Sequence, residues 1–154
     1  MSQNSIIELY TDLATNPDKD FGWEKGLQNA GNHNYNKEWI DNIPSEVWEY
    51  CAAVGNPFDA GVISKGMDVL DIGCGAGVDL CVASILVGKK GTVTVTVTVT
   101  VTVTVTVTVT GIDVTPAMID KARLHATLAN QRNVTANVGT FESNNEQTVT
   151  LLCE

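Results

Sequence analysis

The chain has 154 residues, of which 44% are hydrophobic, 18% charged and 6% aromatic. This composition suits one compact domain with a sizeable core and excludes intrinsic disorder, and no apolar run approaches the ~20 residues of a membrane helix. Nine basic and 18 acidic residues give a net charge of −9, which argues against a nucleic acid partner. The N-terminus lacks the pattern of a secretory signal, and the four cysteines form no CxxC pair. We therefore expect a reduced, cytoplasmic protein with no metal site and no membrane contact.

Residues 1–58 are predicted to form a helical and loop-rich N-terminal extension. Apolar residues at helical spacing predict a short amphipathic helix over residues 5–13, whereas residues 14–42 are polar and typical of loops. A proline at the first turn favours a helix over residues 44–53, and Gly-Asn-Pro at 55–57 would end it.

Residues 59–154 are predicted to form a partial α/β domain. The expected elements are a strand at 67–72, a helix at 78–87 ended by Gly88, a helix at 116–130 after an N-capping Thr115, and strands at 133–138 and 148–153. Alternating strands and helices indicate a Rossmann-like, doubly wound parallel sheet, of which this chain holds the first three to four strands.

Residues 92–110 alternate threonine and valine without interruption. Strict alternation of β-branched residues predicts a strand, but residues 92–112 would extend about 70 Å, whereas most strands have ~5–6 residues. We interpret this Thr-Val tract as the expansion of a short natural strand that gives an over-long strand. Because the tract lacks proline, glycine and charge, self-association through it is also expected.

Three glycines at alternate positions follow the first predicted strand and open the next helix. Gly73, Gly75 and Gly77 would let the backbone turn sharply and approach a ligand, with the free N–H groups of a helix start behind them. A dinucleotide fingerprint has the spacing G-x-G-x-x-G, which would require glycine in place of Val78. The pattern G-x-G-x-G therefore disfavours a nicotinamide cofactor.

An acid at the end of the next strand is the second element expected of a nucleoside site, because a carboxylate can accept bonds from both ribose hydroxyls. Asp113 lies 40 residues after Gly73 (113 − 73), against the ~20 that the fingerprint expects. Removing eight Val-Thr repeats, or 16 residues, leaves a separation of 24 (40 − 16). This repaired spacing supports both the expansion and the nucleoside site.

These motifs resemble those of the class I S-adenosylmethionine-dependent methyltransferases and, within them, the arsenite methyltransferase-like group. The resemblance covers roughly residues 23–142 apart from the tract, and it is carried by the segments 69–77 and 111–116, by Met118 and Ala122, and by the upstream segments 43–47 and 55–57.

The resemblance implies a set of cofactor-binding residues: Asp71, Gly73, Cys74, Gly75, Gly77, Asp113, Val114, Thr140 and Phe141. Asp71 and the glycine-rich backbone would hold the methionine part, and Asp113 the ribose. Val114 would pack on the adenine, whose other side Thr140 and Phe141 would line. Alternatively, Asp71 caps backbone N–H groups, and the last two residues only pack within a loop.

The implied function is methyl transfer from S-adenosylmethionine to a small, arsenite-like acceptor, with this chain supplying mainly the cofactor-binding half. Two departures stand out. Val54 occupies the place of the family's cysteine before Gly-Asn-Pro, with Cys51 the nearest thiol, and the chain ends near the fourth of seven family strands. No catalytic residue is assigned. The alternatives are an NAD(P)-dependent oxidoreductase module and a truncated, non-catalytic, self-associating fragment.

Overall fold

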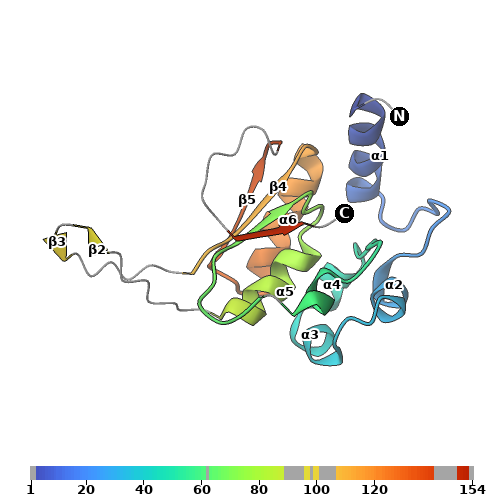
Figure 1. Cartoon of the computed structure of the whole chain (residues 1–154). Coiled ribbons are helices and arrows are strands. Elements are labelled where there is room, and N and C mark those ends of the chain that lie inside the picture. Colours follow the sequence, from blue (N-terminus) through green and yellow to red (C-terminus); the bar gives the residue numbers. More distant parts are fainter. Residues whose placement is uncertain are drawn as a thin grey trace.

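The computed structural model describes residues 3–61, 63–88, 96–97, 99–100, 107–140 and 149–152. Its centre is a parallel sheet with the strand order β5-β4-β1-β6 (Figure 1). The strands are β1 (Val69–Ile72), β4 (Val109–Asp113), β5 (Val134–Val138) and β6 (Val149–Leu152). The chain moves outward from β1 to β4 and β5, and β6 then pairs with the other side of β1. This order confirms the predicted incomplete Rossmann-like α/β sheet, and ligands bind such sheets where the strand order reverses.

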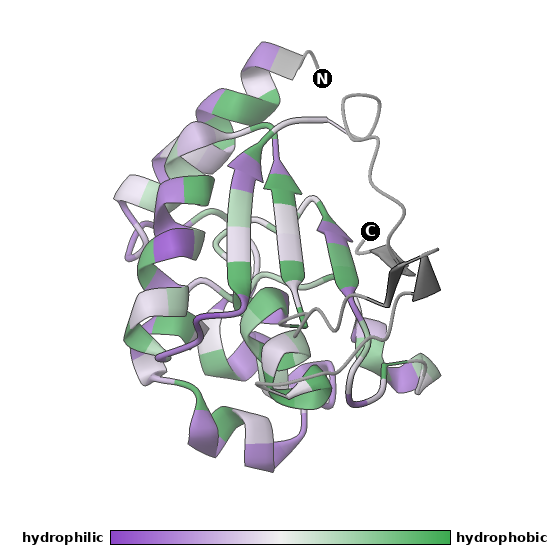
Figure 2. Cartoon of the chain, turned by 90° about the vertical axis from the view of Figure 1, so that its left-hand side faces the viewer, coloured by the Kyte–Doolittle hydropathy of each residue, from purple (hydrophilic) through white to green (hydrophobic). Residues whose placement is uncertain are grey.

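Helix α5 (Val78–Val87) connects β1 to the part of the chain that leads to β4, and α6 (Pro116–Leu128) connects β4 to β5. Both helices begin where the sequence predicts. The two helices contact each other and the same strands, and Figure 2 shows the strands face on beside the helices. Seven of the ten α5 residues are buried, which explains why that helix is apolar on all sides.

Two glycines allow the helices, the sheet and the turn after β1 to approach one another closely. A Cβ atom at Gly111 in β4 would lie 2.5 Å from Leu80 Cδ1 and 2.7 Å from Cys74 Sγ. Gly77, the residue before α5, has φ +84°, and a Cβ there would lie 2.9 Å from Ala122 Cβ in α6. Any larger residue at either position would push these elements apart.

The N-terminal extension contains more helix than its sequence pattern predicts. Its elements are α1 (Gln3–Thr15), α2 (Gly26–Asn32), α3 (Lys37–Asn42), α4 (Ser45–Trp48) and the 3-10 helix η1 (Pro57–Ala60). The prediction of loops over residues 14–42 is therefore wrong for α2 and α3. Helices of six or seven residues show almost no periodicity, and α3 depends on its cap, in which the Asn36 side chain accepts the Glu38 N–H at 2.9 Å.

The helix expected over residues 44–53 is also shorter than predicted. It ends at Trp48 and continues in a tight turn, in which the Cys51 N–H donates to the Trp48 carbonyl at 2.9 Å, and the Cys51 carbonyl then accepts the Gly26 N–H of α2 at 2.7 Å. A long-range backbone hydrogen bond of this kind leaves no trace in the local sequence.

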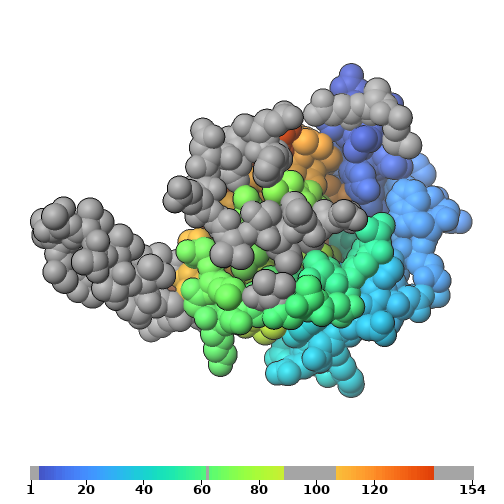
Figure 3. Space-filling view, viewed as in Figure 1, coloured from blue at the N-terminus to red at the C-terminus, as the bar shows by residue number. Residues whose placement is uncertain are grey.

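The extension and the sheet share one hydrophobic core. Tyr35, Trp48 and Phe58 of the extension belong to the same buried cluster as Val69 of β1 and Leu80 of α5. The rings of Tyr35 and Trp48 meet edge to face at 5.7 Å. Figure 3 shows the extension, in blue to cyan, lying against the green α/β part. The domain boundary at residues 58/59 stays a prediction.

In its described residues, 96–97, 99–100 and 107–110, the Thr-Val tract does not form the single over-long strand that its alternation predicts. Within it, β2 (Thr96–Val97) pairs antiparallel with β3 (Val99–Thr100) in a separate two-stranded sheet, away from the main sheet (Figure 1). Among its described residues, only the last two of the tract, Val109 and Thr110, join β4. The other strands of the main sheet have only four or five residues. Additional residues of the tract would therefore find no neighbouring strand with which to form backbone hydrogen bonds.

Candidate cofactor site

The turn between β1 and α5 is a cradle of backbone atoms. Gly73, Gly75 and Gly77 have φ values of +80°, +50° and +84°, a region that other residues rarely adopt. The N–H groups of Gly73 and Cys74 both donate to the Ile112 carbonyl, at 2.8 and 3.0 Å, which ties the turn to the end of β4. The alternate glycines are thus required by the backbone of this turn.

Asp113 lies beside this turn, as the repaired spacing predicts. One carboxylate oxygen accepts the Gly75 N–H at 3.0 Å and the other accepts the Thr115 N–H at 2.8 Å. The tract that separates Asp113 from the glycines in the sequence does not separate them in space, because β1 and β4 are neighbouring parallel strands with Ile72 opposite Ile112. The two motifs therefore form one site at the carboxyl edge of the sheet.

Asp71 is buried in β1, with 1% of its surface exposed. Burial, followed by the negative charges of Asp71 and Asp113, raises the pKa of the Cys74 thiol far above its usual range. Burial likewise raises the pKa of Cys81 to about 12 and that of Cys51 to about 11. These three cysteines are free and buried, so none is a thiolate near neutral pH.

A cavity of about 640 Å³ opens over the turn. Of the predicted site residues, Gly73, Cys74, Gly75, Asp113 and Val114 line it. Asp71, Gly77 and Thr140 do not line it, and Phe141 lies outside the described residues.

One wall of the cavity, residues 50–57, is absent from the predicted site. The buried Asn29 side chain of α2 holds this wall, because its Oδ1 accepts the Ala53 N–H at 2.9 Å and its Nδ2 donates to the Ala53 carbonyl at 3.1 Å. Val54 lines the cavity and is 75% exposed. The Gly-Asn-Pro motif at 55–57 is the sequence signal for this segment. The position of the segment on the cavity depends on the hydrogen bonds from Asn29.

Helix α1 supplies a second wall that the site prediction lacks. Ile6, Tyr10 and Leu13 line the cavity, and Leu13 packs in a small cluster with Ala76 of the turn and Met118 of α6. The helical spacing of these apolar residues predicts that one face of the helix is buried. It does not identify the part of the chain that covers this face.

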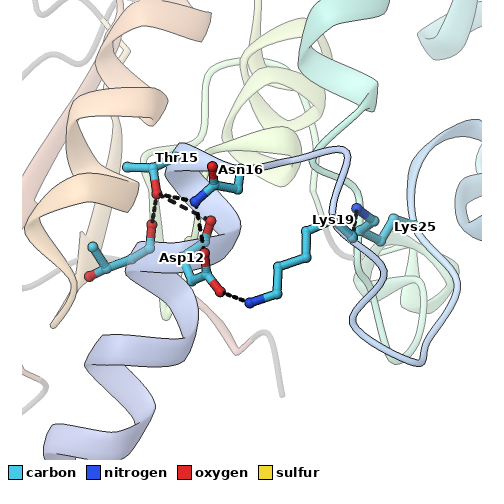
Figure 4. A network of polar contacts seen from close by, with 6 residues as sticks. Asp12, Thr15, Asn16, Lys19 and Lys25 are labelled. Carbon is cyan, nitrogen blue, oxygen red and sulfur yellow. Dashed lines mark hydrogen bonds and ion pairs between the residues drawn. The ribbon is translucent and has the colours of Figure 1, made fainter.

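A polar network fixes the chain directly after α1 (Figure 4). The Asp12 carboxylate pairs with the Lys19 ammonium and accepts the Asn16 Nδ2–H at 2.8 Å. The Lys25 ammonium donates to the carbonyls of Pro17 and Lys19. These contacts hold the segment that leads from α1 to α2.

Two further polar pairs flank the turn. The Tyr35 hydroxyl donates to an Asp79 carboxylate oxygen at 2.7 Å, and the Nδ1 atom of His125 lies 2.7 Å from the Ala76 carbonyl.

In the described part of the chain, no three His, Cys, Asp or Glu side chains gather in a way that could hold a metal ion. None of the described helices is long and apolar enough to cross a membrane.

Comparison with known proteins agrees with this geometry. A family model described as a methyltransferase domain matches residues 63–151, more than half of the chain. An arsenite methyltransferase from Halobacterium salinarum is 34% identical over 85 residues, which are 55% of this chain and 18% of that protein. The crystal structure of an arsenic(III) S-adenosylmethionine methyltransferase from Chlamydomonas reinhardtii matches with 34% identity and a TM-score of 0.50, over 69% of this chain and 32% of that one.

The chain therefore spans less than a third of the length of these two relatives. The matches confirm the resemblance to arsenite methyltransferases that the sequence motifs indicate. On the match of the family model and the fold, the chain belongs to the methyltransferase domain family and resembles its arsenite methyltransferases.

Proposed function

We propose that this chain binds S-adenosylmethionine and forms the cofactor-binding part of a methyltransferase that acts on a small acceptor. The observation that carries the proposal is the position of Asp113, whose carboxylate lines the cavity directly beside the glycine turn. Its two hydrogen bonds, to the N–H groups of Gly75 and Thr115, fix its orientation and leave further lone pairs on both oxygens. Those lone pairs suit the two hydroxyls of a ribose.

The rest of the cavity fits the same cofactor. A volume of about 640 Å³ is in the usual range for a small-molecule site. Val114 and Met118 offer apolar side chains for an adenine, and the backbone of Gly73 and Gly75 offers room for the methionine part. A contact of Thr140 and Phe141 with the adenine stays a prediction from the family resemblance.

When bound, S-adenosylmethionine supplies a methyl group on a positively charged sulfur, which a nucleophile attacks in line, leaving S-adenosylhomocysteine. Such a transfer depends mainly on positioning. In this chain, Asp113 would orient the ribose, and Asp71 would favour a positively charged ligand next to the turn. Ile6 and Tyr10 of α1 would shield the reacting groups from water.

Arsenite is the acceptor that the names of both relatives suggest, and we propose an arsenite-like or other small nucleophilic acceptor for this chain. Val54 on the cavity wall cannot bind arsenic, and the raised pKa of Cys51 keeps that thiol protonated. Cys51 and Cys74 are the thiols that line the cavity, and their raised pKa values disfavour binding of arsenic there, because a thiol must lose its proton to become a ligand. The three buried free cysteines support a reducing, cytoplasmic setting.

Calorimetric titration of the full chain with S-adenosylhomocysteine and with NAD tests the cofactor. We expect binding of S-adenosylhomocysteine and at least tenfold weaker binding by Asp113→Ala, because a hydrogen bond to a charged group contributes ~1.5–3 kcal/mol. Asp120→Ala is the matched control, since that carboxylate lies on α6 with 78% of its side chain exposed. Equal affinity of the unaltered chain and Asp113→Ala would refute the ribose role, and a preference for NAD would favour the oxidoreductase alternative.

A further inference from the structure

A buried histidine contacts the glycine turn at a different residue from Asp113. His125 of α6 is 2% exposed, and its Nδ1 atom lies 2.7 Å from the carbonyl oxygen of Ala76, a residue 49 positions earlier in the chain. A carbonyl oxygen can only accept a hydrogen bond, so the proton must be on Nδ1. The contact therefore assigns one tautomer to a neutral His125.

The surroundings of the ring favour its neutral form. Burial, the largest effect, lowers the pKa of His125, and the positive charge of Lys121 on the same helix lowers it further. The Ala76 carbonyl and the carboxylate of Glu46 in α4 act in the opposite direction but are outweighed. The Tyr50 ring packs against the imidazole with centroids 4.9 Å apart, and Tyr50 itself lines the cavity.

The hydrogen bond from His125 completes the fixation of one peptide group. The Gly77 N–H donates to the Cys74 carbonyl at 2.9 Å, and the Ala76 carbonyl of the same peptide group accepts from His125. With both ends bound, this peptide group cannot rotate without breaking a hydrogen bond. Such rotation is otherwise easy beside a glycine, because glycine tolerates both signs of φ.

We infer that His125 is a positioning residue for the cofactor: its Nδ1–H fixes the Ala76–Gly77 peptide group, so that the turn and the start of α5 present one backbone arrangement to the methionine part. This inference rests on the proposed function. Preorganisation of this kind improves affinity because the turn need not be ordered when the ligand binds.

Two substitutions in the full chain separate positioning from simple packing. In His125→Asn the amide Nδ2 can take the place of Nδ1 and donate to Ala76, whereas His125→Leu fills the space without a donor. We expect His125→Leu to bind S-adenosylhomocysteine about fivefold more weakly than the unaltered chain, and His125→Asn to stay within about twofold. His33→Asn, at the other histidine and outside the cavity, is the control and should not change the affinity.

Thermal unfolding of the same variants measures their stability, which can then be compared with their affinity for S-adenosylhomocysteine. If the side chain only fills space, the apolar leucine should be tolerated at least as well as asparagine in both stability and affinity, because burying a polar group is costly. A positioning role instead makes asparagine the better binder even where leucine is the more stable. Leucine binding as well as asparagine would overturn the inference.

A measurement on the unaltered chain tests the same point without any variant. The ¹⁵N chemical shifts of the His125 ring should show the proton on Nδ1 and should change when S-adenosylhomocysteine is added. A proton on Nε2 would refute the inference. If the unaltered chain binds no S-adenosylhomocysteine, the cofactor proposal itself fails, whereas normal binding with no difference between the variants overturns only the role of His125.

Discussion

Replacing Gly77 with alanine perturbs a close contact between α6 and the turn before α5. The backbone at Gly77 has φ +84°, which costs an L-residue ~1–2 kcal/mol. The new Cβ atom would also lie 2.9 Å from Ala122 Cβ, a distance that Cβ atoms in proteins essentially never show, and 3.1 Å from Ala122 Cα, which is a tight contact. Overpacking of this kind costs ~1–3 kcal/mol. Together the two effects predict a loss of ~2–5 kcal/mol in the free energy of unfolding.

Gly66→Ala is a matched control that isolates the backbone effect. Gly66 has φ +85°, almost the same as Gly77, but nothing lies within 4 Å of a Cβ atom built there. Its substitution should therefore cost only the ~1–2 kcal/mol of the strained backbone. The double variant Gly77→Ala/Ala122→Gly should regain only the part of the overpacking that comes from the Ala122 Cβ atom, because the contact with Ala122 Cα and the strained backbone both remain. The ~1 kcal/mol by which glycine weakens a helix reduces this gain.

Urea unfolding followed by circular dichroism measures these differences as shifts of the midpoint at constant slope. The expected order of stability is the unaltered chain, then Gly66→Ala, then Gly77→Ala. If Gly77→Ala is no less stable than Gly66→Ala, the close contact with Ala122 is not what requires glycine at this position, and the reasoning from packing is wrong.

Three further predictions concern pH, the Thr-Val tract and turnover. Because the folded state lowers the pKa of His125, the unfolded chain binds a proton more readily, and the free energy of unfolding should fall as the pH drops through ~6.5. Urea titrations at several pH values should show a smaller fall for His125→Asn, and an equal fall would contradict the assignment. Deleting 16 residues, so that the Thr94 end joins Gly111, should raise solubility without weakening cofactor binding, as light scattering and calorimetry can check; more aggregation or lost binding would show that the tract is functional. Labelled-methyl assays with arsenite should detect little or no turnover by these 154 residues, which span about a third of the algal enzyme, and robust transfer would contradict this.

The sequence alone predicts the parts of the molecule that depend on local pattern. The helix over residues 78–87 is predicted at both ends, because its apolar run and its flanking glycines lie within a few residues of one another. The meeting of Gly75 with Asp113 is also predictable, because adjacent parallel strands end at the same edge of a sheet. The tract between them does not obscure this, since it lengthens the connection without changing the order of the strands.

Only the tertiary structure decides which residues form the walls of the cavity and which described residues of the tract join the main sheet. Asn29 is hydrogen-bonded to Ala53, 24 residues away, and His125 to Ala76, 49 residues away. No periodic pattern in the sequence predicts these hydrogen bonds. The prediction of one long strand for the tract is wrong although the local sequence signal is strong. The alternation of valine and threonine strongly favours strand formation, but a two-residue repeat specifies neither the register of pairing nor the neighbouring strand. The length of β4 is therefore set by its neighbours β1 and β5.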